Sequence, residues 1–302
     1  MNAAARAGRK AIRAASEIVN LAVLTVILAA MAFGGYALWD SYYITESATA
    51  EQYAKYKPTA DGGPNFAELY ALNPDVCGWL TVYGTNIDYP VTQAEDNWKY
   101  INTSADCKYS LTGSIFLDHR NSRDFTDFNS IIYGHNMTPK VMFGNIKDFK
   151  AQSFFDSHKY GDIFYGGRHY GLELFEFLST DAYDSQTYAP GVTGDSAKKA
   201  YLGKIERSAT FIRDIGVTTA DRIVLLSTCS NTATNERDIL VGRIGDNTYP
   251  DPFETAEEKR AVSGVDGRDP GTIWESLPIW AWGVAAALII LAVVAIIRRR
   301  KH

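Results

Sequence analysis

Two long apolar segments without charged residues, one near each end of the 302-residue chain, restrict its possible folds more than any other feature. Residues 18–39 read IVNLAVLTVILAAMAFGGYALW and residues 277–297 read LPIWAWGVAAALIILAVVAII. Each has about the length of a helix that crosses a bilayer. Basic residues flank both segments on the terminal side, and such residues tend to stay in the cytoplasm. The chain is therefore expected to cross a membrane twice, with both ends inside and the intervening residues outside.

Each segment also has a second interpretation. The first could be a cleaved signal peptide, but it is longer than a typical signal core and no small-x-small cleavage site follows it, which favours an anchor. The second, followed by basic residues, could be the end of a cell-wall sorting signal. GTIWESLPIW contains no LPxTG-like pentapeptide, so the chain is not expected to be a wall-anchored substrate itself.

The part between the two segments is acidic. It has 22 basic and 34 acidic residues, a net charge of −12, which argues against nucleic acid as a partner. Polar stretches with Pro and Gly flank a more regular middle part. The expected organisation is a cytoplasmic basic tail at 1–17, a transmembrane helix at 18–39, an extracellular stalk at 40–64, a folded domain at 65–248, a linker at 249–276, a transmembrane helix at 277–297 and a basic tail at 298–302.

The folded domain has the pattern of a mainly β protein with added helices. Short runs rich in Ile, Val, Tyr and Phe are separated by turn residues, as in an all-β barrel or sandwich. Pro90 indicates an edge strand or an interruption of pairing. Strands are expected at residues 78–83, 86–91, 114–118, 129–135, 162–178 with an internal hairpin turn, 222–229 and 238–244, and helical segments at 65–73, 140–158 and 195–212.

The three cysteines are an odd number for an extracellular chain, so at least one is free. Cys77 lies among apolar neighbours and is expected to be a small buried residue. Cys107 lies in a polar stretch and could pair with Cys77. Cys229 ends the apolar run RIVLLST and is followed by polar residues, which places it where a strand meets a loop. A buried core thiol is the alternative, but a cysteine at such a position can act as a nucleophile if a base or cation supplies its thiolate.

A base for that cysteine must come from the five histidines. His135 ends the run NSIIYGH, so it repeats the pattern of Cys229 at the end of a buried strand. Strand ends at one rim of a barrel bring together residues that are far apart in sequence. The other four are expected in surface turns, polar stretches or the cytoplasmic tail: His119, His158, His169 and His302.

Arg237 follows Cys229 by eight residues and opens the run DILVGRI. Its simplest role is a charge that blocks aggregation at an edge strand. If the runs 222–229 and 238–244 are neighbouring strands, however, the arginine returns to the rim that carries Cys229. A guanidinium suits the binding of a substrate carbonyl and of the oxyanion formed on it. The sequence contains no metal-binding spacing, phosphate loop or GxSxG motif, so neither a metal nor a cofactor is expected.

These motifs together resemble the sortases, membrane-anchored cysteine transpeptidases of Gram-positive cell surfaces. LSTC with Arg237 downstream is similar to the family's TLxTC motif and its arginine, and IIYGHNM is similar to the segment with its histidine. NPDVCGWLTVYGTNIDYPVTQAEDNWKYIN, GSIFLDHRN and NSIIYGHNMTPKVMFG resemble class B over about residues 65–246. The resemblance implies a closed sortase-type β-barrel with added helices, here between two transmembrane helices, in a two-pass protein of the cell membrane whose catalytic domain is extracellular.

The resemblance also implies a two-step acyl transfer. Cys229 would attack the carbonyl of a threonine in a sorting signal, His135 would protonate the leaving amine and later act as a base, and Arg237 would stabilise the oxyanion. The implied partners are sorting-signal-bearing surface proteins or pilins. The acceptor would be the amine of a peptidoglycan precursor such as lipid II or, alternatively, a pilin lysine. The residues that match the family's peptide groove are Asn97, Ile101, Tyr133, Ser227, Thr228 and Tyr188.

The chain departs from the family pattern at several positions. Leu225 stands where the motif usually begins with threonine. Ser230 and Asn231 stand where many class B members have an acidic residue, which favours arginine as the third catalytic member. A second membrane segment is more familiar among pilin-polymerising sortases. Two other functions stay open from the residues alone: a cysteine peptidase that releases acyl groups to water, and a membrane-tethered binding domain without enzymatic activity.

Overall fold

The structure is a computed structural model that describes residues 3–46, 48–59, 64–137, 140–229 and 235–254. Within these residues one compact unit ends at Tyr43 and a second begins at Ile44. The first contains most of the helix α1, Ala3–Glu46, whose segment Ala7–Tyr42 includes an 18-residue stretch with a mean hydropathy of 2.2 and is long and apolar enough to cross a membrane. The predicted segment 18–39 lies inside it. The predicted second membrane segment, 277–297, lies outside the described residues.

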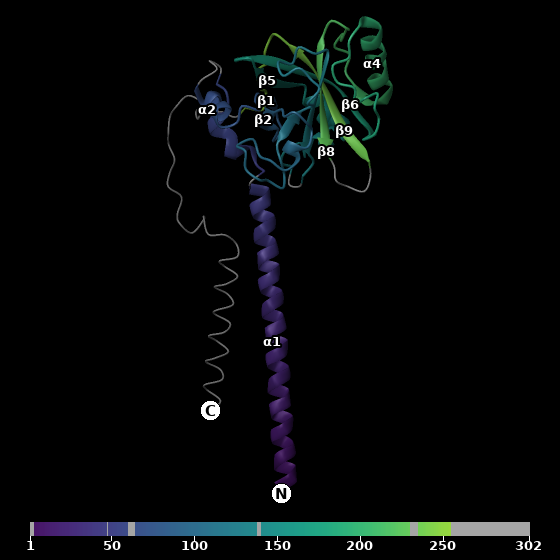
Figure 1. Ribbon diagram of the computed structural model, residues 1–302. Coiled ribbons are helices and arrows are strands. Elements are labelled where there is room, and N and C mark those ends of the chain that lie inside the picture. Colours follow the sequence, from purple (N-terminus) through teal and green to yellow (C-terminus); the bar gives the residue numbers. More distant parts are fainter. Residues whose placement is uncertain (1–2, 47, 60–63, 138–139, 230–234, 255–302) are drawn as a thin grey trace. The chain divides into compact units, whose positions relative to one another are not determined.

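A closed β-barrel forms the second unit (Figure 1). Eight strands pair in the order β5-β1-β2-β3-β4-β8-β9-β6, and β6 pairs again with β5 to close the ring, so the prediction of a closed barrel is confirmed. A ninth strand, β7, pairs with residues 176–178 of β6, beyond the part of β6 that pairs with β5. The strands are β1 Val76–Val82, β2 Asp88–Thr92, β3 Ile115–Leu117, β4 Asn129–His135, β5 Tyr160–Tyr165, β6 Arg168–Asp181, β7 Ala209–Ile212, β8 Arg222–Cys229 and β9 Glu236–Gly245.

The central strand β8 shows how the barrel separates two hydrophobic clusters. Val224 and Leu226 belong to the larger core cluster, whereas the alternating residues Ile223 and Leu225 belong to a second cluster that includes Tyr201 of the helix α4, Asp195–Ser208. This alternation follows the two-residue period of a strand. Because both faces of β8 are apolar and buried, a slip of its register would be costly, and the positions of its end residues are therefore well defined.

Short helical segments surround the barrel, and α4 packs against β6 (Figure 1). Tyr53 and Tyr56, which lie within the range expected to be a stalk, are buried in the larger core cluster. The remaining helical segments are η1 Ala50–Tyr56, α2 Pro64–Leu72, η2 Lys99–Ile101, η3 Ile146–Lys150 and α3 Gln152–Ser157.

Two of the predicted helices are wrong in extent. The expected helix at 140–158 is two short helical segments, η3 and α3, separated by the extended residue Ala151. The expected helix at 195–212 ends at Ser208, because Ala209 takes an extended conformation and residues 209–212 pair with β6, where Phe211 packs against the core. Of the two alternatives for Pro90, the edge strand is wrong, because β2 has neighbours on both sides. The interruption of pairing is confirmed, since the ladder with β3 contains only Val91 and Thr92 and begins after the proline.

The predictions for the cysteines and histidines hold in part. Cys77 and Cys107 are both free thiols, and burial raises the pKa of the Cys77 thiol to about 12, as expected of a packed core residue. His158 is not a surface residue. It is buried, and its ring stacks on Phe154 at 3.6 Å and on Phe253 at 4.6 Å between centroids.

Candidate active site

The ends of three adjacent strands bring the three candidate catalytic residues to one level of the barrel. β4 and β8 are parallel, and their register runs from Asn129 beside Ile223 to His135 beside Cys229. β9 runs antiparallel to β8, with Ser227 opposite Ile239. The β8–β9 ladder ends at this pair, two residues before Cys229 and two residues after Arg237, so Arg237 lies on the neighbouring strand near the same end of the sheet. Since neighbouring strands lie about 4.8 Å apart, the backbones of the paired residues His135 and Cys229 are close together.

His135 is half-buried, and its ring is held from one side by the main chain. Its Nε2 lies 3.1 Å from the carbonyl oxygen of Ile101. Ile101 ends the turn η2, more than thirty residues earlier in the chain. The histidine therefore has a fixed hydrogen-bond partner on a separate loop.

Arg237 is half-buried between two acidic residues that are engaged elsewhere. The Lys150 ammonium lies 3.0 Å from Asp238 and 3.9 Å from Glu236. Ser179 also donates to Asp238, at 2.8 Å. In the part of the chain that the structure describes, Arg237 itself has no carboxylate within 4 Å, and it donates a 3.3 Å hydrogen bond to the Glu236 carbonyl. Its charge is therefore available to an anionic oxygen of a ligand.

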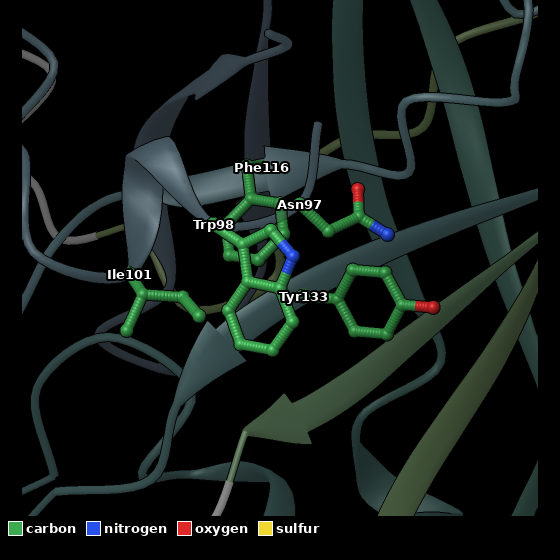
Figure 2. A pocket seen from close by; sticks show the side chains of 5 residues that line it. All are labelled: Asn97, Trp98, Ile101, Phe116 and Tyr133. Atoms are coloured by element: carbon green, nitrogen blue, oxygen red, sulfur yellow. The ribbon is translucent and has the colours of Figure 1, made fainter. Parts of the chain in front are cut away.

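A shallow pocket lies next to this strand end. It has a volume of about 220 Å³ and is lined by Asn97, Trp98, Ile101, Phe116 and Tyr133 (Figure 2). Figure 2 shows the polar ends of Asn97 and Tyr133 on one side, away from Ile101. Three of the five residues were expected in a peptide groove from the sequence. Trp98 and Phe116 were not, although the position of Trp98 in the sequence, between the expected groove residues Asn97 and Ile101, could have indicated it.

The other predicted groove residues divide into two kinds. Tyr188 stacks on Tyr133 with centroids 6.2 Å apart, and its hydroxyl lies 2.9 Å from the hydroxyl of Ser227, which is buried. Tyr188 and Ser227 are thus connected to Tyr133 but are not among the residues that line the pocket. Thr228 is buried, and its hydroxyl accepts from the main-chain N–H of Asp238 at 3.1 Å. Its side chain therefore connects β8 to β9 and does not line the pocket.

The site contains a buried carboxylate that the sequence did not reveal. Asp118 is fully buried and accepts from Asn97 Nδ2 at 3.1 Å and from the Tyr133 hydroxyl at 3.0 Å. Arg120 adds two hydrogen bonds, of 2.9 and 2.8 Å. Burial alone would raise the pKa of Asp118, but the bonds from Arg120 outweigh it and hold the pKa below its usual value. Asp118 is therefore ionised, and it holds Asn97 and Tyr133, which line the pocket, in position.

Tyr133 stays a hydrogen-bond donor for the same reason. Burial, followed by the charge of Asp118, raises the pKa of the phenol far above its ordinary value. Among the described residues, no group of three or more His, Cys, Asp or Glu side chains is arranged to hold a metal ion. The chemistry of the described site thus rests on an imidazole, a guanidinium and an apolar pocket with fixed polar ends.

No family model matches the chain. Individual proteins do match it. The sortase B of Listeria monocytogenes is 35% identical over 179 residues, which are 59% of this chain and 70% of that protein. The chain belongs to the sortase B family. As a sortase B, it is a cysteine transpeptidase, and sortases are membrane-associated enzymes of the cell surface.

Solved structures of class B sortases have the same fold. Sortase B from the type II pilus of Streptococcus pneumoniae is 49% identical, with a TM-score of 0.53 over 60% of this chain and 99% of that one. A class B sortase of Streptococcus pyogenes involved in pilus biogenesis is 42% identical, with a TM-score of 0.55 over 59% of this chain and 97% of that one. The predicted family, class and barrel are therefore confirmed.

Proposed function

We propose that Cys229, His135 and Arg237 are the catalytic residues of this sortase. In the first step the Cys229 thiolate attacks the carbonyl carbon of the threonine in a sorting signal. Arg237 binds the resulting oxyanion. The C–N bond then breaks as His135 gives a proton to the leaving amine, which leaves a thioacyl enzyme. In the second step His135 takes a proton from an acceptor amine, the new amide bond forms and the Cys229 thiolate leaves.

A single observation supports this assignment most strongly: the parallel register that sets His135 beside Cys229 at the ends of β4 and β8. The role of Arg237 is supported by its position on β9, next to the end of the β8–β9 ladder, and by the pairing of its acidic neighbours with Lys150. A guanidinium that has no carboxylate partner among the described residues can stabilise negative charge as it develops on the substrate oxygen.

The same proposal assigns the pocket to the sorting signal. The residues before the threonine would lie against Asn97, Ile101 and Tyr133, with Tyr188 and Ser227 supporting Tyr133 from the side of β8. The apolar lining suits an aliphatic or proline side chain of the peptide, and the amide of Asn97 suits its main chain. Thr228 would act indirectly, by holding β8 against β9 next to Cys229.

For the acceptor, we propose the amine of a peptidoglycan precursor such as lipid II, so that the enzyme attaches surface proteins to the cell wall. The enzyme would cross the membrane at residues 18–39 and 277–297 and expose its catalytic domain, residues 65–248, outside the cell. The helix α1, with its apolar segment Ala7–Tyr42, supports the first crossing.

The second candidate is the joining of pilins through a lysine acceptor. The identities of 49% and 42% to two class B sortases of pili favour it. Both candidates use the same thioacyl enzyme and differ only in the amine that resolves it. The alternatives are therefore separated by the acceptor and not by the catalytic residues.

The test uses the full chain in detergent micelles, a library of sorting-signal peptides and either a peptidoglycan stem peptide or a pilin domain as the amine. We expect an amide-linked product with the stem peptide, detected by mass spectrometry, and no product from Cys229→Ala. Faster product formation with the pilin lysine would select the second candidate. Full turnover by Cys229→Ala would contradict the proposed catalytic role.

A further inference from the structure

The hydrogen bond between His135 and Ile101 determines more than the position of the ring. A carbonyl oxygen only accepts, so the Nε2 atom that lies 3.1 Å from it carries a hydrogen. Neutral imidazole has a single N–H, and Nδ1 is then the nitrogen with a free lone pair. Among the described residues none forms a hydrogen bond to Nδ1. The two ring nitrogens of His135 thus have different tasks.

We propose that the main-chain carbonyl of Ile101 is a positioning group that fixes the tautomer of His135 and makes Nδ1 the nitrogen that exchanges protons. The charged ring carries a hydrogen on both nitrogens. Nδ1 gives its proton to the leaving amine and later takes one from the acceptor amine, while the Nε2–H bond to Ile101 stays formed. A carbonyl here has the orienting task that a carboxylate or amide side chain has in other histidine-dependent enzymes.

The position of this carbonyl is fixed by a close contact with Gly113. Gly113 has a φ of +59°, and a Cβ atom on it would lie 2.4 Å from the Ile101 oxygen and 2.2 Å from the Tyr100 oxygen. The next residue, Ser114, donates its main-chain N–H to that Tyr100 oxygen at 3.0 Å. A side chain at 113 would have to displace the carbonyls, so glycine allows the loop to hold them in place.

The turn η2 also connects His135 to the peptide pocket. Ile101 lines the pocket with its side chain and holds His135 with its carbonyl. Tyr100 anchors this turn, since its hydroxyl donates to Asp75 at 2.9 Å and its ring is buried. A peptide in the pocket therefore touches the residue that orients the acid and base.

This inference deepens the proposed function and rests on His135 being the acid and base of the reaction. It is tested first on the full-length chain labelled with ¹³C and ¹⁵N histidine, in detergent and without substrate. The signals of His135 are assigned by their loss in His135→Gln. We expect the neutral ring to be the Nε2–H tautomer. An Nδ1–H tautomer would overturn the inference whatever the activity of the enzyme.

A second measurement uses Gly113→Ala with Gly166→Ala as the matched control. Gly166 has a φ of +57°, and a Cβ atom on it would meet nothing within 4 Å, so it carries similar backbone strain without the contact. We expect Gly113→Ala to shift the tautomer of His135 and to lower kcat about tenfold or more, with a smaller change in KM. Gly166→Ala should change neither quantity by more than about twofold.

A changed tautomer in Gly113→Ala with an unchanged kcat would also overturn the inference. If Gly113→Ala does not fold, the tautomer of the unmodified chain decides the question. Failure of the proposed function is recognised separately, because full turnover by His135→Gln would remove His135 from the reaction and leave the measured tautomer as it is.

Discussion

The buried carboxylate of Asp118 accepts a 3.0 Å hydrogen bond from the hydroxyl of Tyr133, a residue that lines the peptide pocket. Arg120 neutralises this carboxylate with two hydrogen bonds and also approaches the carbonyl of Tyr188 at 3.4 Å. The pocket is thus fixed from behind by an ion pair that makes no contact with its interior. The shape of the pocket therefore depends on the charged carboxylate of Asp118, which lies in a stretch of sequence typical of a surface turn.

Replacing Asp118 by Asn should weaken both the fold and peptide binding. The substitution leaves Arg120 without its partner and gives the pocket a side chain that accepts fewer hydrogen bonds. We expect a loss of about 2 to 4 kcal/mol in the free energy of unfolding and a several-fold higher KM for the peptide. Thermal unfolding and initial rates measure the two effects.

Asp214→Asn is the control for Asp118, because this carboxylate is exposed and accepts from one main-chain N–H, that of Gly216. It should change neither quantity measurably. The stabilising effect of Asp118 should also depend on pH. Its folded-state pKa is lowered, so the contribution is complete above the unfolded pKa of about 3.9 and is lost as the pH falls through the folded value. An Asp118→Asn protein as stable as the unmodified one at pH 7 would contradict this role.

Trp98→Ala should affect binding without affecting stability. The Trp98 side chain lines the pocket and is 76% exposed, so the fold gains little from it whereas a bound peptide would cover it. We expect KM for the peptide to rise about three- to tenfold and the unfolding temperature to stay within about 2 °C. Tyr70→Ala, an exposed aromatic on α2, should leave both unchanged. An unchanged KM in Trp98→Ala would show that the peptide avoids this pocket.

Glu176→Gln should make the protein less sensitive to alkaline pH. Glu176 is buried, its Oε1 has no hydrogen-bond partner, and burial together with the charge of Glu206 raises its pKa to about 8. Between the unfolded pKa of about 4.5 and about 8, folding must bind a proton, so stability falls as the pH rises. We expect the variant to gain about 1 to 3 kcal/mol at pH 8 and little at pH 4.5.

Unfolding temperatures at the two pH values measure this effect, at about 2–4 °C for each kcal/mol in a domain of this size. Glu206 is exposed, and Glu206→Gln should raise the unfolding temperature at pH 8 by a smaller amount. An equal gain at both pH values would show that Glu176 does not titrate in this range.

Arg237→Lys tests the need for a guanidinium. Lysine keeps the charge but loses the planar fork of donors, and we expect kcat to fall about 10²-fold with little change in stability. Stability should hold because Arg237 has no carboxylate partner among the described residues. Arg207→Lys, at an exposed position of α4, is the control and should keep full activity. An unchanged kcat in Arg237→Lys would show that Arg237 acts only through its positive charge and not through the geometry of the guanidinium.

The sequence predicted the residues whose chemistry is visible locally. His135 and Cys229 were identifiable because apolar runs end at them, and the structure sets them side by side in one ladder. Asn97, Ile101 and Tyr133 were expected in a groove on the basis of family resemblance, and they line the same pocket. The ends of apolar runs and the motifs of a family are read from short stretches of sequence, so they can be recognised without knowledge of the fold.

Features that depend on distant partners were missed. Asp118 opens the polar stretch DHRNSRD, which is typical of a surface turn, and it is buried because Asn97, Arg120 and Tyr133 enclose it. His158 is buried because Phe253, almost a hundred residues later, stacks on it. The strand β7 continues a helical pattern and is extended only because β6 offers it an edge. Such contacts are a property of the closed barrel and not of any local segment.

The central claim, that Cys229 carries the acyl group, is tested most directly by trapping the thioacyl enzyme. The full chain is incubated with a sorting-signal peptide without an amine acceptor, stopped in acid, digested and examined by mass spectrometry. The chain offers its own controls, the buried thiol of Cys77 and the exposed thiol of Cys107. The acyl mass should appear on Cys229 alone and disappear with hydroxylamine. An acyl group on Cys107, or transfer of the peptide with Cys229 unmodified and replaceable by alanine, would contradict the account.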